Sequence, residues 1–125
     1  MGMIWDILNS MRKNLVENLD VRTVIIGDGD IPASLMPAAR IFPVSVISNS
    51  SAEIPMIFDL STTIEFIFLP KTEQNEITSQ IHIVEQILNS DIYPVGCEIK
   101  HSPSSRISRN NNSAKIELTI RWYER

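Results

Sequence analysis

The stretch that decides the fold is "KIELTIRWYER", residues 115–125, because apolar and polar side chains alternate along it. With a period of two, one face carries apolar side chains, which are Ile116, Leu118, Ile120 and Trp122. The opposite face carries Glu117, Thr119, Arg121 and Tyr123. Such alternation predicts a β-strand with one buried and one wet face. Its outer face is therefore a candidate surface for a partner.

A second strong β signal is "MIFDLSTTIEFIFL", residues 56–69, where Ile64, Phe66 and Phe68 alternate with Glu65 and Ile67. This pattern predicts a strand that is buried on one face and largely covered on the other. Weaker signals predict three further strands, which lie within residues 21–30, at 44–48 and at 95–100.

Two segments have the periodicity of amphipathic helices. The first spans residues 3–19, and its apolar face consists of Ile4, Leu8, Met11, Leu15 and Leu19. The second spans residues 75–90, and its buried stripe consists of Ile77, Ile81, Val84 and Leu88. Residues 31–43 contain three prolines and are predicted to be a structured connection. Residues 49–53, "NSSAE", are predicted to be a turn or loop.

The resulting order, α-β-β-β-α-β-β, predicts a single α+β domain over residues 1–125. We expect one antiparallel or mixed sheet with two helices packed on it, a two-layer sandwich. Cys97 is the one cysteine, which excludes an internal disulfide and a cysteine-based zinc cluster, so we interpret it as a small core residue. We also expect no signal peptide and no membrane span, and therefore a protein made in a cytoplasm.

Charge is distributed unevenly along the chain. The net charge is −4, but the residues from 100 onward carry six basic and two acidic side chains, a surplus of +4. The first 99 residues therefore carry −8. A basic end on an acidic body attracts nucleic acid or an acidic neighbour, including another copy of the chain. The pI of about 5.1 argues against a dedicated DNA-binding protein.

Residues 101–113, "HSPSSRISRNNNS", are predicted to form a flexible polar loop, which is either a solvated hairpin tip or an arm that becomes ordered when a neighbouring protein or DNA binds. Trp5 lies off the apolar stripe of the first helix, which indicates either a core position or, as we favour, an association patch. The candidate contacts to partners or neighbouring subunits are therefore Trp5, Arg106, Arg109, Asn110, Asn111, Asn112, Arg121 and Tyr123.

No set of residues indicates a catalytic, metal or cofactor site. "GDGD", residues 27–30, lacks the further ligands of a phosphate or calcium loop and is predicted to be a plain turn. His82 and His101 have no nucleophile or orienting group near them in the pattern. Glu65 and Glu98 would meet only if their strands pair, and a carboxylate-based enzyme is the alternative that depends on this. We therefore expect a protein that is not an enzyme.

The linear pattern as a whole resembles the bacteriophage tail terminator and tail completion proteins of the neck region. The resemblance covers nearly the whole chain and is carried by an N-terminal amphipathic helix, "FPVSVIS" (42–48), "TTIEFIFLP" (62–70), "HIVEQILNSDIYPVG" (82–96) and "KIELTIRWYER".

This resemblance implies a structural virion protein of a long-tailed phage, assembled in the host cytoplasm. Such a subunit forms a ring, often a hexamer, that terminates the tail tube and joins it to the head–tail connector. Its partners would be further copies of itself, the tail tube protein and the connector proteins. The alternative from another class is a small nucleic-acid-binding domain that uses the basic residues 100–125.

Overall fold

The computed structural model describes residues 2–19, 23–27, 37–51, 54–69, 71–108 and 113–124. Its elements, in chain order, are α1 (Gly2–Asn18), β1 (Thr23–Ile26), β2 (Ala38–Ser51), β3 (Ile54–Ile67), α2 (Gln74–Leu88), β4 (Cys97–Ser108) and β5 (Ser113–Glu124). This order confirms the predicted α-β-β-β-α-β-β arrangement.

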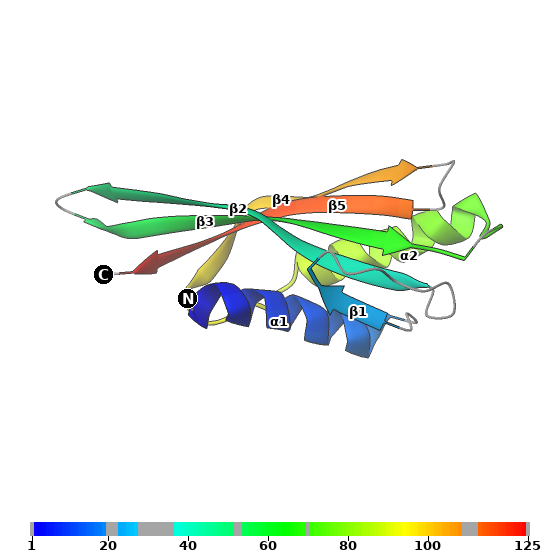
Figure 1. The fold of residues 1–125 in the computed structure, drawn as a ribbon, viewed down its shortest axis with the longest axis horizontal. Coiled ribbons are helices and arrows are strands. Elements are labelled where there is room, and N and C mark those ends of the chain that lie inside the picture. Colours follow the sequence, from blue (N-terminus) through cyan, green and yellow to red (C-terminus); the bar gives the residue numbers. More distant parts are fainter. Residues whose placement is uncertain are drawn as a thin grey trace.

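The strands form one mixed sheet in the spatial order β1-β2-β3-β5-β4. Only β1 and β2 are parallel, and the other neighbouring strands are antiparallel. Both helices lie on the same face of this sheet (Figure 1). The protein is therefore a two-layer α+β fold, as the sequence predicts.

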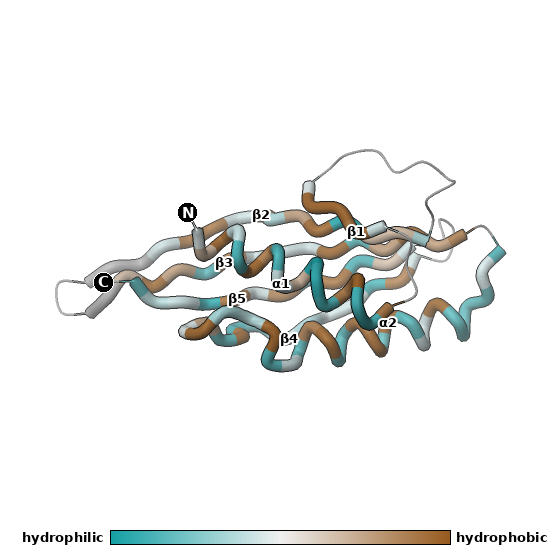
Figure 2. The backbone as a smooth tube through the Cα atoms, turned by 90° about the horizontal axis from the view of Figure 1, so that it is seen from below, coloured by the Kyte–Doolittle hydropathy of each residue, from teal (hydrophilic) through white to brown (hydrophobic). Residues whose placement is uncertain are grey.

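The core fills the space between the helices and one face of the sheet. In β5 the predicted apolar face is buried, and it consists of Ile116, Leu118, Ile120 and Trp122. The helices contribute the side chains that recur every three or four residues, and brown and teal segments alternate along α2 accordingly (Figure 2). The buried helical residues are Ile7, Leu8, Met11, Leu15, Ile77, Ile81, Val84 and Leu88. Phe58 stacks on Trp122 with ring centroids 5.3 Å apart.

Strand β2 begins earlier than predicted, at Ala38. The prediction of an irregular connection over residues 31–43 is therefore wrong from Ala38 onward, and residues 31–36 lie outside the described part. Pro37 immediately precedes this strand. Pro43 is compatible with it because Pro43 lies at a register shift beside residue 45, where an irregular strand tolerates a missing N–H. The turn predicted at residues 49–53 also begins later, because β2 continues to Ser51.

Strand β4 is twice as long as predicted and runs from Cys97 to Ser108. The prediction of a flexible loop over residues 101–113 is therefore wrong for residues 101–108, and residues 109–112 lie outside the described part. The physical reason is that β5 provides a partner along this whole length, with Ser104 opposite Glu117 and Ser108 opposite Ser113. Val95, predicted to start this strand, lies before it and is 99% exposed.

The hairpin of β2 and β3 extends past the helices at one end of the molecule (Figure 1). We call this extension the arm and define it as residues 44–51 and 54–59. Strand β1 pairs with β2 only over residues 38–41. In the described chain, therefore, β2 has a neighbouring strand only on its β3 side from residue 42 onward.

We predict that Ile64→Ala lowers the free energy of unfolding by about 2–5 kcal/mol, because Ile64 is fully buried and its truncation leaves a cavity. The matched control is Ile83→Ala on α2, where the side chain is 38% exposed, and we expect a change within about 0.5 kcal/mol. Denaturant unfolding at neutral pH measures both. Equal effects of the two substitutions would contradict the assigned core.

Candidate interaction surface

The sheet face opposite the helices, which we call the open face, carries polar side chains in rows across β3, β5 and β4. Antiparallel pairing places the members of each row directly opposite one another. The rows, in the order β3, β5, β4, are Asp59–Arg121–Glu98, Ser61–Thr119–His101, Thr63–Glu117–Ser104 and Glu65–Lys115–Arg106.

Asp59 is the most buried charged side chain of this face, with an exposed fraction of 3%. Arg121 Nε donates to Asp59 Oδ1 at 2.8 Å, and Arg121 Nη2 donates to Oδ2 at 3.1 Å. Lys100 Nζ donates to Asp59 Oδ2 at 2.7 Å. These contacts join β3, β5 and β4, and we call the three residues the Asp59 cluster.

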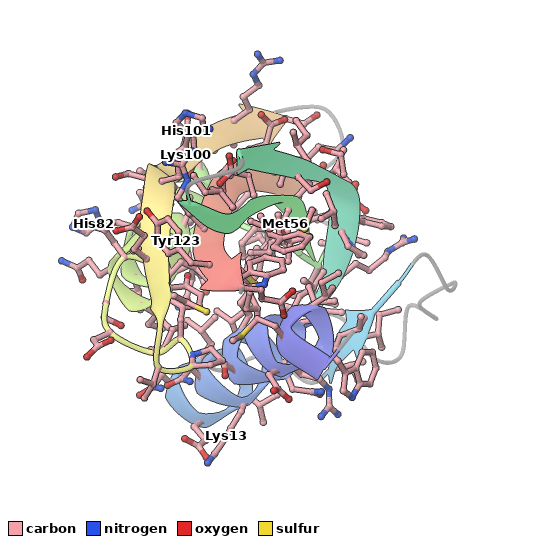
Figure 3. All side chains as sticks on the ribbon, turned by 90° about the vertical axis from the view of Figure 1, so that its left-hand side faces the viewer. Lys13, Met56, His82, Lys100, His101 and Tyr123 are labelled. Carbon is pink, nitrogen blue, oxygen red and sulfur yellow. The ribbon has the colours of Figure 1, made fainter. Side chains whose placement is uncertain are left out.

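An irregularity in β4 brings Lys100 to this position. The register shifts between Ile99 and His101, so Lys100 is the extra residue where β4 passes Thr119. A bulge of this kind re-aims a side chain on an antiparallel strand. Lys100 and His101 accordingly lie next to each other on the part of β4 away from α1 (Figure 3).

The cluster fixes the ionisation of Asp59. The hydrogen bond from Arg121 is the main cause that lowers the pKa of Asp59, helped by that from Lys100 and opposed by burial, which raises it. The net effect is a pKa that falls from the ordinary 3.8 to about 2. The same hydrogen bond raises the pKa of Arg121. Asp59 and Arg121 are therefore both charged at neutral and mildly acidic pH.

Glu65 and Glu98 do not meet, which removes the carboxylate pair on which the enzyme alternative depends. Strand β5 lies between β3 and β4, and Glu98 belongs to the row of Asp59 and not to that of Glu65. Glu98 instead accepts a hydrogen bond from the Tyr123 hydroxyl at 2.8 Å, which raises the pKa of Tyr123. Glu65 Oε1 lies 3.5 Å from Arg40 Nε.

A shallow hollow of about 320 Å³ lies in the middle of the open face. Its lining includes Val44 from β2, Ser61 from β3, Thr119 from β5 and His101 from β4. Ser61 Oγ and Thr119 Oγ1 lie 3.4 Å apart. His101 belongs to the same row as these hydroxyl groups, but within the described residues no hydrogen bond joins it to either of them, as an activated nucleophile would require.

Among the described residues, no three His, Cys, Asp or Glu side chains gather in a group that could hold a metal ion. Within the same part of the chain, no helix is long and apolar enough to cross a membrane.

The basic end of the chain is partly neutralised in the fold. Lys100 and Arg121 are both bonded to Asp59. Arg106 and Lys115 lie directly opposite each other on β4 and β5, and neither has an ion pair within the described residues. Glu65 lies directly opposite Lys115 on its other side, so the row Glu65–Lys115–Arg106 retains a surplus of one positive charge.

The arm is nearly uncharged and exposes several apolar side chains. The sequence from residue 41 to residue 52 contains no charged side chain. The arm and the adjoining end of β5 expose a group of large side chains that are each at least 40% accessible, namely Val44, Val46, Ile47, Met56 and Tyr123. An exposed apolar group of this kind marks a surface for association.

The predicted contact residues are distributed over separate surfaces. Arg121 and Tyr123 lie on the open face of β5, and Arg106 is exposed on the open face of β4. Trp5 lies in the helical layer and is 57% exposed, so it is not part of the core. Four predicted contacts lie outside the described residues, and these are Arg109, Asn110, Asn111 and Asn112.

Sequence reasoning missed Asp59, Lys100 and the apolar residues of the arm. The signal for Asp59 was its position as the one charge between residues 54 and 64. A lone charge inside a strand that becomes buried requires an opposite charge beside it. The signal for the arm was the uncharged run of residues 41–52.

Comparison with known proteins gives no relative. No family model matches the sequence, and no curated protein matches it significantly.

We predict that Asp59→Asn lowers the free energy of unfolding at pH 7 by about 1–3 kcal/mol, because it leaves Lys100 and Arg121 without their carboxylate. The control is Glu117→Gln, an exposed carboxylate on the same face, with an expected change within about 0.5 kcal/mol.

The cluster also predicts a pH dependence. Since folding lowers the pKa of Asp59 from 3.8 to about 2, its contribution to stability is complete above pH 3.8 and is lost as the pH falls toward about 2. Denaturant unfolding at several pH values measures this loss in the wild type. Asp59→Asn should show a smaller loss over the same interval, and an identical pH profile would contradict the assignment.

Proposed function

We propose that the protein is a structural subunit of a long-tailed bacteriophage, which forms a ring that terminates the tail tube and meets the head–tail connector. The observation that carries this proposal is the arm, a hairpin that extends past the helical layer (Figure 1) and exposes Val44, Val46, Ile47 and Met56. Met56 lies opposite Glu124 and Ile57 opposite Tyr123, so Met56 and Tyr123 both lie at the arm end. Figure 3, which looks along the molecule from that end, labels both.

A head-to-tail ring requires two different surfaces on each subunit. The arm provides one apolar surface, and the exposed Trp5 on α1 provides a second in the other layer. The α+β architecture is also the one that the resemblance to tail terminator and tail completion proteins implies. Both features support an assembly subunit.

Charge supports the same arrangement. Arg106 and Lys115 leave positive charge on the open face, whereas α2 exposes acidic side chains such as Glu76. Opposite charges on different surfaces of one chain favour contact between successive copies in a fixed orientation. Binding of nucleic acid is less well supported, because Lys100 and Arg121 are already bonded to Asp59.

The test is electron microscopy of the phage that encodes the chain. We expect antibody against the protein to label the head-proximal end of the tail, and the full chain added to tail tubes to form rings of about six copies. Label confined to another part of the virion, or none at all, would overturn the proposal.

A variant in the arm adds a residue-level prediction. Met56→Glu should abolish ring formation on tail tubes, because it places a charge in an apolar contact surface. The control is Gln86→Glu, which adds the same charge on the exposed side of α2. Circular dichroism confirms that both variants fold. Intact rings with Met56→Glu would show that the arm is not a subunit contact.

A further inference from the structure

The two edges of the sheet differ in how open they are to pairing with another strand. On one side, β1 pairs with residues 38–41 of β2. This pairing ends at Gly27, whose N–H donates a hydrogen bond to the Ile41 carbonyl at 2.9 Å. In the described chain no further strand pairs with residues 44–51 on that side. We call this stretch the free edge of β2. Its backbone groups that point away from β3 are available to another strand.

The opposite edge, β4, has the features with which proteins prevent unwanted strand pairing. It has register shifts between Ile99 and His101 and between His101 and Ser104, and it contains Pro103. It also carries Lys100 and Arg106. The free edge of β2 carries no charge. It also has register shifts, between Pro43 and Ser45 and between Asn49 and Ser51, so its regular stretch is residues 45–49.

We propose that the free edge of β2 pairs, antiparallel, with the same edge of a second copy of this chain around a two-fold axis. Such an isologous contact needs only one self-complementary surface, and β2 supplies one edge that is open while β4 is protected. The lack of charge suits the same occupant. A contact around a two-fold axis sets identical side chains near one another, so a charged edge would repel its own copy, whereas residues 41–52 carry no charge.

The side chains of the free edge suit this pairing on both faces. Val46 lies opposite Leu60 and so belongs to the helix side, whereas Ile47 lies opposite Asp59 and belongs to the open face. Both are exposed in the single chain. An antiparallel partner places its own Val46 and Ile47 on the same two faces, so apolar side chains meet across the new pair.

The dimer is a property of the free chain and does not rest on the proposed function. Both contacts involve the arm, but the dimer pairs the backbone edge of β2 with itself, whereas a closed ring joins two different surfaces of each subunit. Pairing also covers an edge that otherwise invites uncontrolled aggregation. Loss of the dimer with normal labelling of tails would therefore overturn this inference alone.

The experiment is sedimentation equilibrium of the full chain over roughly two decades of concentration. We expect the mass to rise from 14.2 kDa to twice that value. Val46→Lys should raise the dissociation constant at least about tenfold, because it places two like charges near the two-fold axis. The matched control is Ser104→Lys, an exposed position on the other edge, which should leave the dissociation constant unchanged.

Hydrogen exchange of the wild type gives a second test that needs no variant. Outward amides within residues 44–48 should exchange more slowly as the concentration rises, while those of β4 should not change. Three outcomes would overturn the proposal. They are the mass of a single chain at every concentration, a dimer that both lysine variants weaken equally, and amide protection that rises with concentration in β4 and not in β2.

Discussion

The pairing of β3 with β5 is the interaction on which the rest of the structure depends. It runs without interruption from Met56 opposite Glu124 to Ile67 opposite Ser113, and it is the longest pairing in the sheet without a register shift. Because side chains alternate along a strand, one unbroken register assigns every residue of both strands to a face. The apolar residues of both strands therefore meet the helices as one continuous surface.

The outer strands adapt to this regular centre by irregularities. The bulge of β2 beside Ser45 and the bulge of β4 beside His101 lie at the two ends of one row, whose middle members are Ser61 and Thr119. Bulges increase the twist and bend of a strand. The position of both bulges in the same row accounts for the hollow in the open face, whose lining includes residues from β2, β3, β5 and β4. One of them also delivers Lys100 to Asp59.

The sheet thus has a protected edge and an open edge, and this asymmetry links the architecture to assembly. Strand β4 combines charge, proline and irregular register, whereas the arm combines an unpaired backbone with exposed apolar side chains. An arm of this kind is costly to leave in water. A protein that assembles with copies of itself or with neighbours has a physical use for it, and the Asp59 cluster holds the strands at its base together.

The sequence by itself determined the number, type and order of the elements and the buried face of each helix and of β5. These features are local, because the periods of two and 3.6 are written in consecutive residues such as 115–123 and 77–88. It did not determine that the polar residues 101–108 form a strand, since that depends on the partner which β5 provides. The tertiary structure alone decided that Asp59 meets Lys100 and Arg121, that Glu65 and Glu98 stay apart, and that residues 44–51 remain an edge. Each of these depends on which strands are neighbours and in what register, and a single strand's own sequence carries no record of either.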